Sequence, residues 1–162
     1  MQPLVILQLL ILLLVATGTP VIATRVWGHR LSYPLDFGVR YFDGRHLLGP
    51  SKTMRGVVLS ILVTSACAPM VGLEWKIGAV VGSAAMAGDL FSSFLKRRLR
   101  LPASSRATGL DQIPEALFPL VACRPMLALT VADIAVGVAV FFIGELVLSR
   151  LLYKLRVRSQ PF

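Results

Sequence analysis

The chain has 162 residues, of which 56% are hydrophobic and only 15% charged, and its 17 Lys and Arg against 8 Asp and Glu give a net charge of +9. Soluble domains usually carry about 25% charged residues, so one soluble core cannot bury this much apolar surface and lipid must cover part of it. The basic excess suits anionic lipid headgroups or nucleotide phosphates. Two cysteines in apolar segments are too few for a metal cluster or a disulfide framework.

The sequence contains apolar segments at residues 4–23, 57–73, 77–95, 113–128 and 131–152. The first has no charge and about 20 residues, enough to cross ~30 Å of hydrocarbon. A cleaved signal peptide is the alternative, but there is no basic n-region before it, so we favour a retained span. The fourth segment is short and interrupted by Pro119, Arg124 and Pro125. We therefore predict an all-α membrane protein of about five transmembrane helices, with residues 1–162 forming a single domain.

The basic residues are distributed unevenly between the connections. Residues 25–56 contain six Lys or Arg, the connection after the third segment five and the tail after residue 149 four, whereas the other two connections contain one each. The positive-inside rule then places the N-terminus outside, and the C-terminus and two basic loops in the cytoplasm. For a multi-pass protein of the plasma (inner) membrane, the active site is expected on the cytoplasmic side.

The third segment is rich in small residues, and Gly78 and Gly82 form a small-xxx-small pair that lets helix backbones approach closely. We expect this face to pack within the chain, with a homodimer interface as the alternative.

The end of the same segment, "AGDLFSSFLKRRLRL", combines an acid, hydroxyls and bases. At about 100° per residue one face of a helix collects a polar stripe, and the opposite face collects Leu90, Phe91, Phe94 and Leu95. The stripe consists of Asp89, Ser92, Ser93, Lys96 and Arg100. Basic residues at a span's end can be simple interfacial anchors, which suits Arg98, whereas an acid gains nothing from anionic headgroups and is a functional candidate.

A carboxylate beside cations is what phosphate chemistry with Mg²⁺ requires. The segment "GLDQIPEALF" supplies Asp111 or Glu115 as a second carboxylate, although Asp111 is equally placed to cap a helix. Asp133 and Thr130 are instead typical of a helix-start pair on the outer side.

The first loop mixes acids, bases and glycines. Residues 44–53 nearly match a P-loop, but the required Gly-Lys pair is absent, so we reject a Walker A site. Lys52, Thr53 and Arg55 remain suited to gripping phosphate at a helix N-terminus. His29 and His46 are isolated.

Three stretches together resemble the CDP-archaeol synthase family: "LDFGVRYFDGRHLLGPSKTMRG", "GDLFSSFLKRRLRLP" and "LDQIPEALF". The resemblance covers residues 34–153. It implies a CTP-dependent membrane cytidylyltransferase, distantly related to bacterial CDP-diacylglycerol synthases, that uses Mg²⁺ to transfer CMP to a lipid phosphate. By matching position, Asp89 and Asp111 would hold the metal and act with Lys96 in catalysis. Phosphate or nucleotide contacts would come from Asp43, Gly44, Lys52, Thr53, Arg55, Ser93 and Arg97.

The chain departs from the family after Asp111-Gln112, where an Asp before an aromatic residue is expected and Ile113, Pro114 and Glu115 follow. Residues 101–109 are also Ser- and Arg-rich instead of Trp- and Pro-rich. The departures concern the lipid substrate and one metal ligand, so isoprenoid and acyl lipid phosphates both stay open.

A non-catalytic membrane protein or a small transporter-like relative is the alternative function. A transporter should place polar groups near the bilayer midplane, whereas here they cluster at cytoplasmic ends, which favours an enzyme. A nucleic-acid partner is not expected, because such binders need an exposed aromatic and basic platform.

Overall fold

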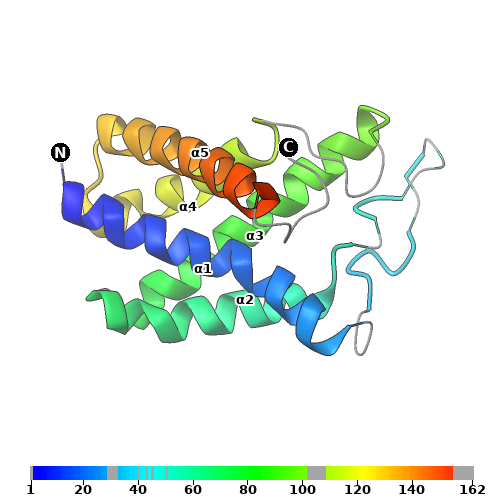
Figure 1. Ribbon diagram of the computed structural model, residues 1–162, viewed down its shortest axis with the longest axis horizontal. Coiled ribbons are helices and arrows are strands. Elements are labelled where there is room, and N and C mark those ends of the chain that lie inside the picture. The colour runs from blue at the N-terminus through cyan, green and yellow to red at the C-terminus, as the bar shows by residue number, and fades with distance from the viewer. Residues whose placement is uncertain are drawn as a thin grey trace.

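The computed structural model describes residues 2–28, 33–39, 41–42, 44, 46–49, 51–101 and 109–154. Their helices are α1 (Pro3–Trp27), α2 (Met54–Cys67), the short 3-10 helix η1 (Ala68–Val71), α3 (Trp75–Arg98), α4 (Gln112–Leu127) and α5 (Val131–Lys154) (Figure 1). These residues form no β-strand, and an isolated bridge pairs Pro34 with Thr53. The predicted all-α fold is confirmed.

Four of the helices are long and apolar enough to cross a membrane: α1, α2 continued by η1, α3 and α5. Helix α4 has 16 residues and contains Pro119 and Pro125. At 1.5 Å per residue it is about 24 Å long, whereas the hydrocarbon layer is about 30 Å thick. The predicted multi-pass membrane protein is confirmed, and α4, predicted as one of the five spans, is shorter than the four candidate spans. Which end of the helices faces the cytoplasm stays a prediction.

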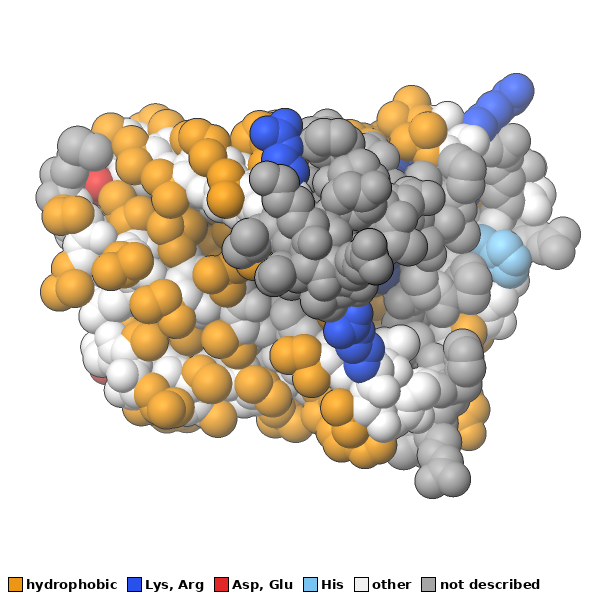
Figure 2. Space-filling view, in the orientation of Figure 1, with side chains coloured by type: hydrophobic (Ala, Val, Ile, Leu, Met, Phe, Trp, Pro, Cys, Tyr) orange, Lys and Arg blue, Asp and Glu red, His pale blue; other side chains and the backbone are white. Residues whose placement is uncertain are grey.

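Successive helices run in alternating directions, which brings the α1–α2 loop, the end of α3 and the start of α4 to one end of the bundle (Figure 1). On the face shown in Figure 2, Lys and Arg side chains lie between the middle of the molecule and this end, and apolar side chains predominate on the opposite half. The exposed apolar residues include Leu4, Leu62 and Ile143. This distribution fits a bundle that faces lipid along its length and water at the end that carries the loop.

The core of the bundle lies between α1, α3 and α4. Leu9, Leu12, Leu13 and Ala16 of α1 are almost fully buried. Helix α3 packs most extensively against α4 and α2. It therefore occupies the centre of the fold.

Helix α3 approaches α2 closely because two of its residues have no side chain. A Cβ at Gly78 would lie 2.6 Å from the Thr64 carbonyl oxygen, and one at Gly82 would lie 3.0 Å from Cα of Ile61. The first distance is shorter than a methyl group tolerates, and the second is tighter than most contacts of a real Cβ. The small-xxx-small pair thus packs within the chain, as predicted, and a homodimer remains an untested alternative.

The N-termini of α5 and α1 are joined at the end of the bundle opposite the loop. The Thr130 N–H donates to Asp133 Oδ2 at 3.0 Å and the Asp133 N–H donates to Thr130 Oγ1 at 3.2 Å, which is a capping box. The Gln2 N–H also donates to Asp133 Oδ1, at 3.0 Å. The predicted helix-start role of Asp133 is confirmed, and this carboxylate additionally caps α1.

A buried hydroxyl compensates for a proline inside α1. Pro20 has no N–H, so the carbonyl of Ala16 one turn earlier lacks its usual helical donor. Ser60 of α2 is fully buried, and its Oγ donates to the Ala16 oxygen at 2.8 Å. This interhelical bond supplies the donor that Pro20 removes.

We predict that Ser60→Ala destabilises the bundle by about 1–3 kcal/mol, because it leaves a buried carbonyl unsatisfied. Thermal unfolding in detergent measures the loss. Ser65→Ala is the matched control, since its hydroxyl bonds to Ile61 in its own helix and that carbonyl keeps its helical donor. In the double variant Pro20→Ala, Ser60→Ala the backbone N–H returns, so the penalty should shrink. Equal losses for the single and double variants would contradict this account.

Candidate active site

The site is built where α3 and α4 make their closest contact. A Cβ at Gly88 would overlap the backbone of Pro114 and lie 2.9 Å from Cα of Glu115. Only glycine allows this approach. Because the two helices run in opposite directions, it places Glu115 level with Asp89, and Asp111, one turn earlier in α4, nearer the end of the bundle.

The polar stripe predicted on α3 faces inward. Ser92, Ser93 and Lys96 are buried and Asp89 is half-buried, whereas Phe91 on the opposite side is exposed. The Ser92 hydroxyl donates to the Asp89 carbonyl at 2.9 Å. Arg100 does not continue the stripe, because α3 ends at Arg98 and Arg100 is exposed with a left-handed φ of 63°.

Two ion pairs connect this stripe to its neighbours. Lys52 Nζ, from the α1–α2 loop, donates to both Asp89 oxygens at 2.6 Å. Lys96 Nζ lies 2.8 Å from Asp111 Oδ1 at the start of α4. All four side chains were predicted as site residues, and the structure brings them to the same end of the bundle.

Asp111 had two alternative roles in the sequence, capping α4 or acting in the site. It precedes α4 at the N-cap position, but its side chain makes no capping hydrogen bond. The carboxylate instead pairs with Lys96. The contact with Lys96 therefore favours the site role.

Glu115 is the other acid of this region. It lies in the first turn of α4 and is 9% exposed. Asp89, Asp111, Glu145 and Lys52 lie near enough to act electrostatically on its carboxylate. The sequence offered both Asp111 and Glu115 as sources of a second carboxylate, and the structure brings both acids to the same region.

The loop between α1 and α2 is organised by a buried acid, Asp36. Its carboxylate accepts the N–H groups of Gly38 at 3.1 Å, Leu48 at 3.1 Å and Gly49 at 3.0 Å. The loop is closed at its base, where the Leu35 N–H donates to the Lys52 carbonyl at 2.8 Å and the Met54 N–H donates to the Tyr33 carbonyl at 3.1 Å. These bonds hold Lys52 at the end of the loop.

Arg98 fastens the same loop to α3. Its guanidinium lies 4.7 Å from the centre of the Tyr41 ring and 5.1 Å from that of Phe94, and it donates to the His46 carbonyl at 3.0 Å. The expectation that Arg98 serves only as a headgroup anchor was therefore incomplete. Cation–π contacts of this kind contribute about 0.5–1 kcal/mol at exposed positions.

Other predicted residues have structural partners of their own. Thr53 is the N-cap of α2, where its Oγ1 accepts the Gly56 N–H at 3.2 Å. Arg55 donates to the Gly28 carbonyl at the end of α1, at 3.1 Å. Gly44 lies in the loop with a left-handed φ of 74°, and Arg97 is half-buried in the last turn of α3. Asp43 lies outside the described residues.

The donor set suits Mg²⁺ in its chemistry, because Mg²⁺ prefers carboxylate oxygens. In the described part of the chain, however, no three His, Cys, Asp or Glu side chains are arranged to hold a metal ion. The Lys52 ammonium lies where a cation chelated by both Asp89 oxygens would lie. Holding a metal at Asp89 therefore requires Lys52 to move.

Comparison with known proteins agrees with the fold and the motifs. The family model described as CarS-like, CDP-archaeol synthase, matches residues 3–79 and 70–162. The chain belongs to the CDP-archaeol synthase family. The family resemblance found in the three sequence stretches is thus confirmed.

Individual relatives cover most of the chain. The CDP-archaeol synthase of Sulfurisphaera tokodaii is 31% identical over 135 residues, covering 80% of this chain and 81% of the relative. That of Pyrobaculum calidifontis is 30% identical over 153 residues, 91% of each chain. A solved structure, described as an intramembrane enzyme for archaeal membrane lipids biosynthesis, has a TM-score of 0.75 at 29% identity and covers 86% of this chain and 89% of that one.

We predict that Gly88→Ala disrupts the site. The new methyl group would push α4 away from α3, and overpacking of this kind costs about 1–3 kcal/mol. Thermal unfolding measures the loss. Gly144→Ala in α5 is the control, since its Cβ would meet no atom within 4 Å and replacing a helical glycine gains up to about 1 kcal/mol. An unchanged unfolding temperature for Gly88→Ala would show that the contact between α3 and α4 does not require a glycine at this position.

The ionisation of Asp36 should make the stability of the α1–α2 loop depend on pH. Burial raises the pKa of the Asp36 carboxyl, but the N–H donors of Gly49, Leu48 and Gly38 outweigh it, so the net pKa is below the ordinary value. The ionised carboxylate therefore stabilises the folded loop above an unfolded pKa of about 3.9, and this contribution is lost as the pH falls through the lower folded pKa.

Hydrogen-exchange protection of the three bonded amides should accordingly fall in acid. Asp36→Asn should reduce the protection at neutral pH and remove most of its acid dependence. Glu74→Gln, an exposed acid at the other end of the bundle, should change neither. Protection that is insensitive both to acid and to Asp36→Asn would contradict the role of this carboxylate.

Proposed function

We propose that this protein is a membrane cytidylyltransferase that transfers CMP from CTP to a lipid phosphate, giving a CDP-lipid and pyrophosphate. The observation that carries the proposal is the pair of lysine–carboxylate contacts, Lys52 with Asp89 and Lys96 with Asp111, at one end of an apolar bundle. Membership of the CDP-archaeol synthase family supports it. Such an end is where a water-soluble nucleotide can meet a lipid headgroup.

In this reaction an oxygen of the lipid phosphate attacks the α-phosphorus of CTP. A new phosphorus–oxygen bond forms, the bond between the α-phosphorus and the oxygen bridging to the β-phosphate breaks, and pyrophosphate leaves with that electron pair. The attacking phosphate is already anionic and needs no deprotonated hydroxyl. Catalysis then depends on positioning and on neutralising phosphate charge.

The two lysines suit the neutralising role. Each now pairs with a carboxylate, and incoming phosphate oxygens would compete for the same ammonium groups. Transfer of Lys52 to phosphate would leave the Asp89 oxygens, with those of Asp111, available to a Mg²⁺ ion. Asp89 and Asp111 would hold the Mg²⁺ ion, which would supply positive charge against the repulsion between carboxylates and phosphates. Ser93 and Arg97, toward the same end of α3, remain proposed phosphate-binding residues.

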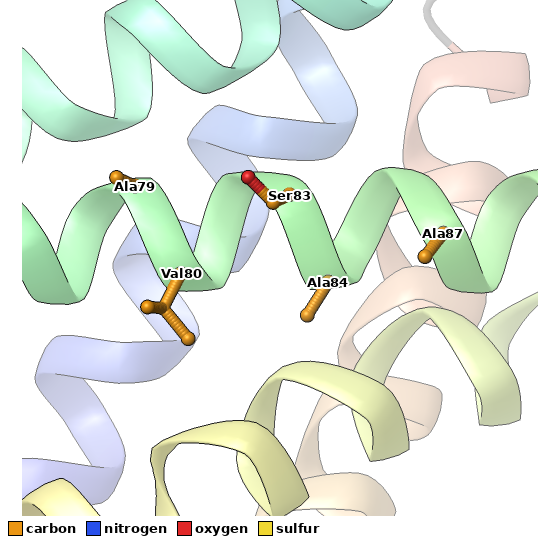
Figure 3. A pocket seen from close by; sticks show the side chains of 5 residues that line it. All are labelled: Ala79, Val80, Ser83, Ala84 and Ala87. Carbon is orange, nitrogen blue, oxygen red and sulfur yellow. The ribbon is translucent and has the colours of Figure 1, made fainter.

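An open and largely apolar groove lies along α3. It has a volume of about 480 Å³ and is lined by Ala79, Val80, Ser83, Ala84 and Ala87, on the face between α2 and α4 (Figure 3). At about 100° per residue Ala87 and Asp89 lie about 200° apart, so the groove opens on the side of α3 opposite the polar stripe. We place the site on the cytoplasmic side of the plasma membrane.

We predict that the purified protein, with Mg²⁺ and radiolabelled CTP, converts a lipid phosphate to a CDP-lipid. Asp89→Asn should reduce this activity by at least about 100-fold, as expected when an electrostatic group of the transition state is lost. Thin-layer chromatography of the labelled lipid measures both. Glu74→Gln is the control for a neutralised acid outside the site.

The lipid panel should include both isoprenoid ether and acyl ester phosphates, since the sequence leaves the chain chemistry open. If the folded wild-type protein labels none of them, the reaction assignment is wrong and the non-catalytic alternative applies.

A further inference from the structure

The loop between α1 and α2 presents apolar side chains to its surroundings. Phe42 is 99% exposed and Phe37 is 75% exposed, and Tyr33 and Val39 are exposed as well. The loop projects beyond the start of α2, at the end of the bundle (Figure 1). Single exposed apolar residues are ordinary on a protein surface, whereas several gathered on one segment mark an interaction surface.

The outward direction of these side chains is built into the backbone of the loop. The Asp36 carboxylate is buried and accepts the Gly38 N–H at 3.1 Å, whereas Phe37 between them has a left-handed φ of 45°. This φ is unfavourable for a residue with a Cβ. The Val39 N–H donates to the Asp36 carbonyl at 2.7 Å and closes the turn. The turn thus buries its acid and exposes its aromatic ring, at a conformational cost that contact of the ring with an apolar surface would offset.

The base of the loop lies where α1 leaves the hydrocarbon layer. Helix α1 has 25 residues and is about 38 Å long at 1.5 Å per residue, whereas the hydrocarbon is about 30 Å thick. Its last turn, with the exposed Trp27, therefore extends toward the headgroups. Arg55 of α2 donates to the Gly28 carbonyl at 3.1 Å, and the Met54 N–H donates to the carbonyl of the exposed Tyr33 at 3.1 Å. The loop consequently begins and ends at headgroup depth.

The exposed charges around the loop are positive. Arg25, in the last turn of α1, and Arg100, just after α3, are both exposed. The acids that the structure describes toward this end are all buried or half-buried, and they are Asp36, Asp89, Asp111, Glu115 and Glu145. Aromatic rings are enriched at the interface between membrane and water, and basic side chains are attracted to anionic lipids. The surface therefore complements the headgroup layer of an anionic membrane.

We propose that the α1–α2 loop lies in the headgroup layer of the bilayer, with Phe37 and Phe42 inserted among anionic lipids. The depth of the loop's base, its basic surroundings and its continuity with the lipid-facing helices favour the bilayer over a protein partner. The inference is independent of the proposed reaction, because it concerns the lipids around the protein and not the lipid phosphate that reacts. Lys52 ends this loop and contacts Asp89, so lipid contact would also help to hold that ammonium in place.

The test uses Phe42→Trp as a reporter of depth, in a background in which Trp27 and Trp75 are replaced by Phe. The full-length protein is placed in phosphatidylcholine nanodiscs with or without phosphatidylglycerol. Bromine on the acyl chains quenches tryptophan that contacts lipid, and acrylamide quenches tryptophan that contacts water. Leu62→Trp, at an exposed position of α2, is the control for contact with lipid chains. Tryptophan amide free in the buffer is the control for full exposure to water.

The emission of the tryptophan at position 42 should be shifted to the blue relative to tryptophan amide. It should be quenched by brominated chains and shielded from acrylamide, and both effects should be larger with phosphatidylglycerol. Arg100→Asn removes a base and keeps a residue that tolerates the left-handed φ, so it should reduce the added effect of phosphatidylglycerol. Lys76→Gln, which removes an exposed base at the opposite end of α3, should leave that effect unchanged.

Acrylamide quenching as strong as that of tryptophan amide, with no quenching by brominated chains, would overturn the inference and place the loop in water. Shielding from both quenchers would also overturn it, because a second copy of the chain would then cover the loop. Shielding that appears only with CTP would indicate a nucleotide contact instead. Equal signals with and without phosphatidylglycerol would refute the preference for anionic lipid. Phe37→Trp is the second reporter, and the unfolding temperature of each variant in detergent verifies its fold.

Discussion

The contact between Gly88 and the backbone of Pro114 and Glu115 is the constraint on which the site depends. Helix axes usually lie 8–10 Å apart, at a distance set by the side chains between them. A glycine at the contact lets α3 and α4 meet backbone to backbone. Their register then fixes which acid of α4 lies level with Asp89. A shift of one residue would turn the carboxylates by about 100° around α4 and separate them from the stripe on α3.

This contact also explains how the chain keeps charges inside a largely apolar bundle. An isolated charge in such surroundings is expensive, and paired charges are tolerated only when their geometry is good. Here the acids lie on α3 and α4 and one of the lysines comes from a loop at the bundle end, so each pair joins separate parts of the fold. The same arrangement leaves the pairs open to exchange with phosphate, because one partner of each can reorient without breaking a helix.

Much of this architecture was accessible from the sequence because its signals are local. The length of the apolar segments predicted the spanning helices, and the 100° periodicity of the third predicted a polar stripe that turned out to be buried. Thr53 and Arg55 show that local sequence signals do not predict which partners a side chain contacts in the fold. Both residues suit phosphate binding in type and spacing. In the fold, however, the Thr53 hydroxyl caps the first turn of α2 and the Arg55 guanidinium donates to the Gly28 carbonyl.

Residues whose roles depend on distant partners were harder to assign. Asp36 is linked to Leu48 and Gly49, more than ten positions away, and nothing near it in the sequence indicates that it organises a loop. Asp111 has the spacing of a helix cap, but Lys96 of the preceding helix is its partner. Loop closure and helix register decide these cases, and neither can be derived from the pattern of one segment.

Lys52 finally shows why the loop and the site form one unit. Its carbonyl accepts the Leu35 N–H in the bridge that closes the loop, and its ammonium binds Asp89 on α3. The backbone bond fixes where the side chain begins, so the reach of the ammonium depends on the loop being closed. Asp36 supports that closure by holding Leu48 and Gly49, and Arg98 holds the same loop to α3 through His46. A carboxylate and a guanidinium outside the charged cluster thus determine the position of Lys52, the loop residue whose ammonium contacts Asp89.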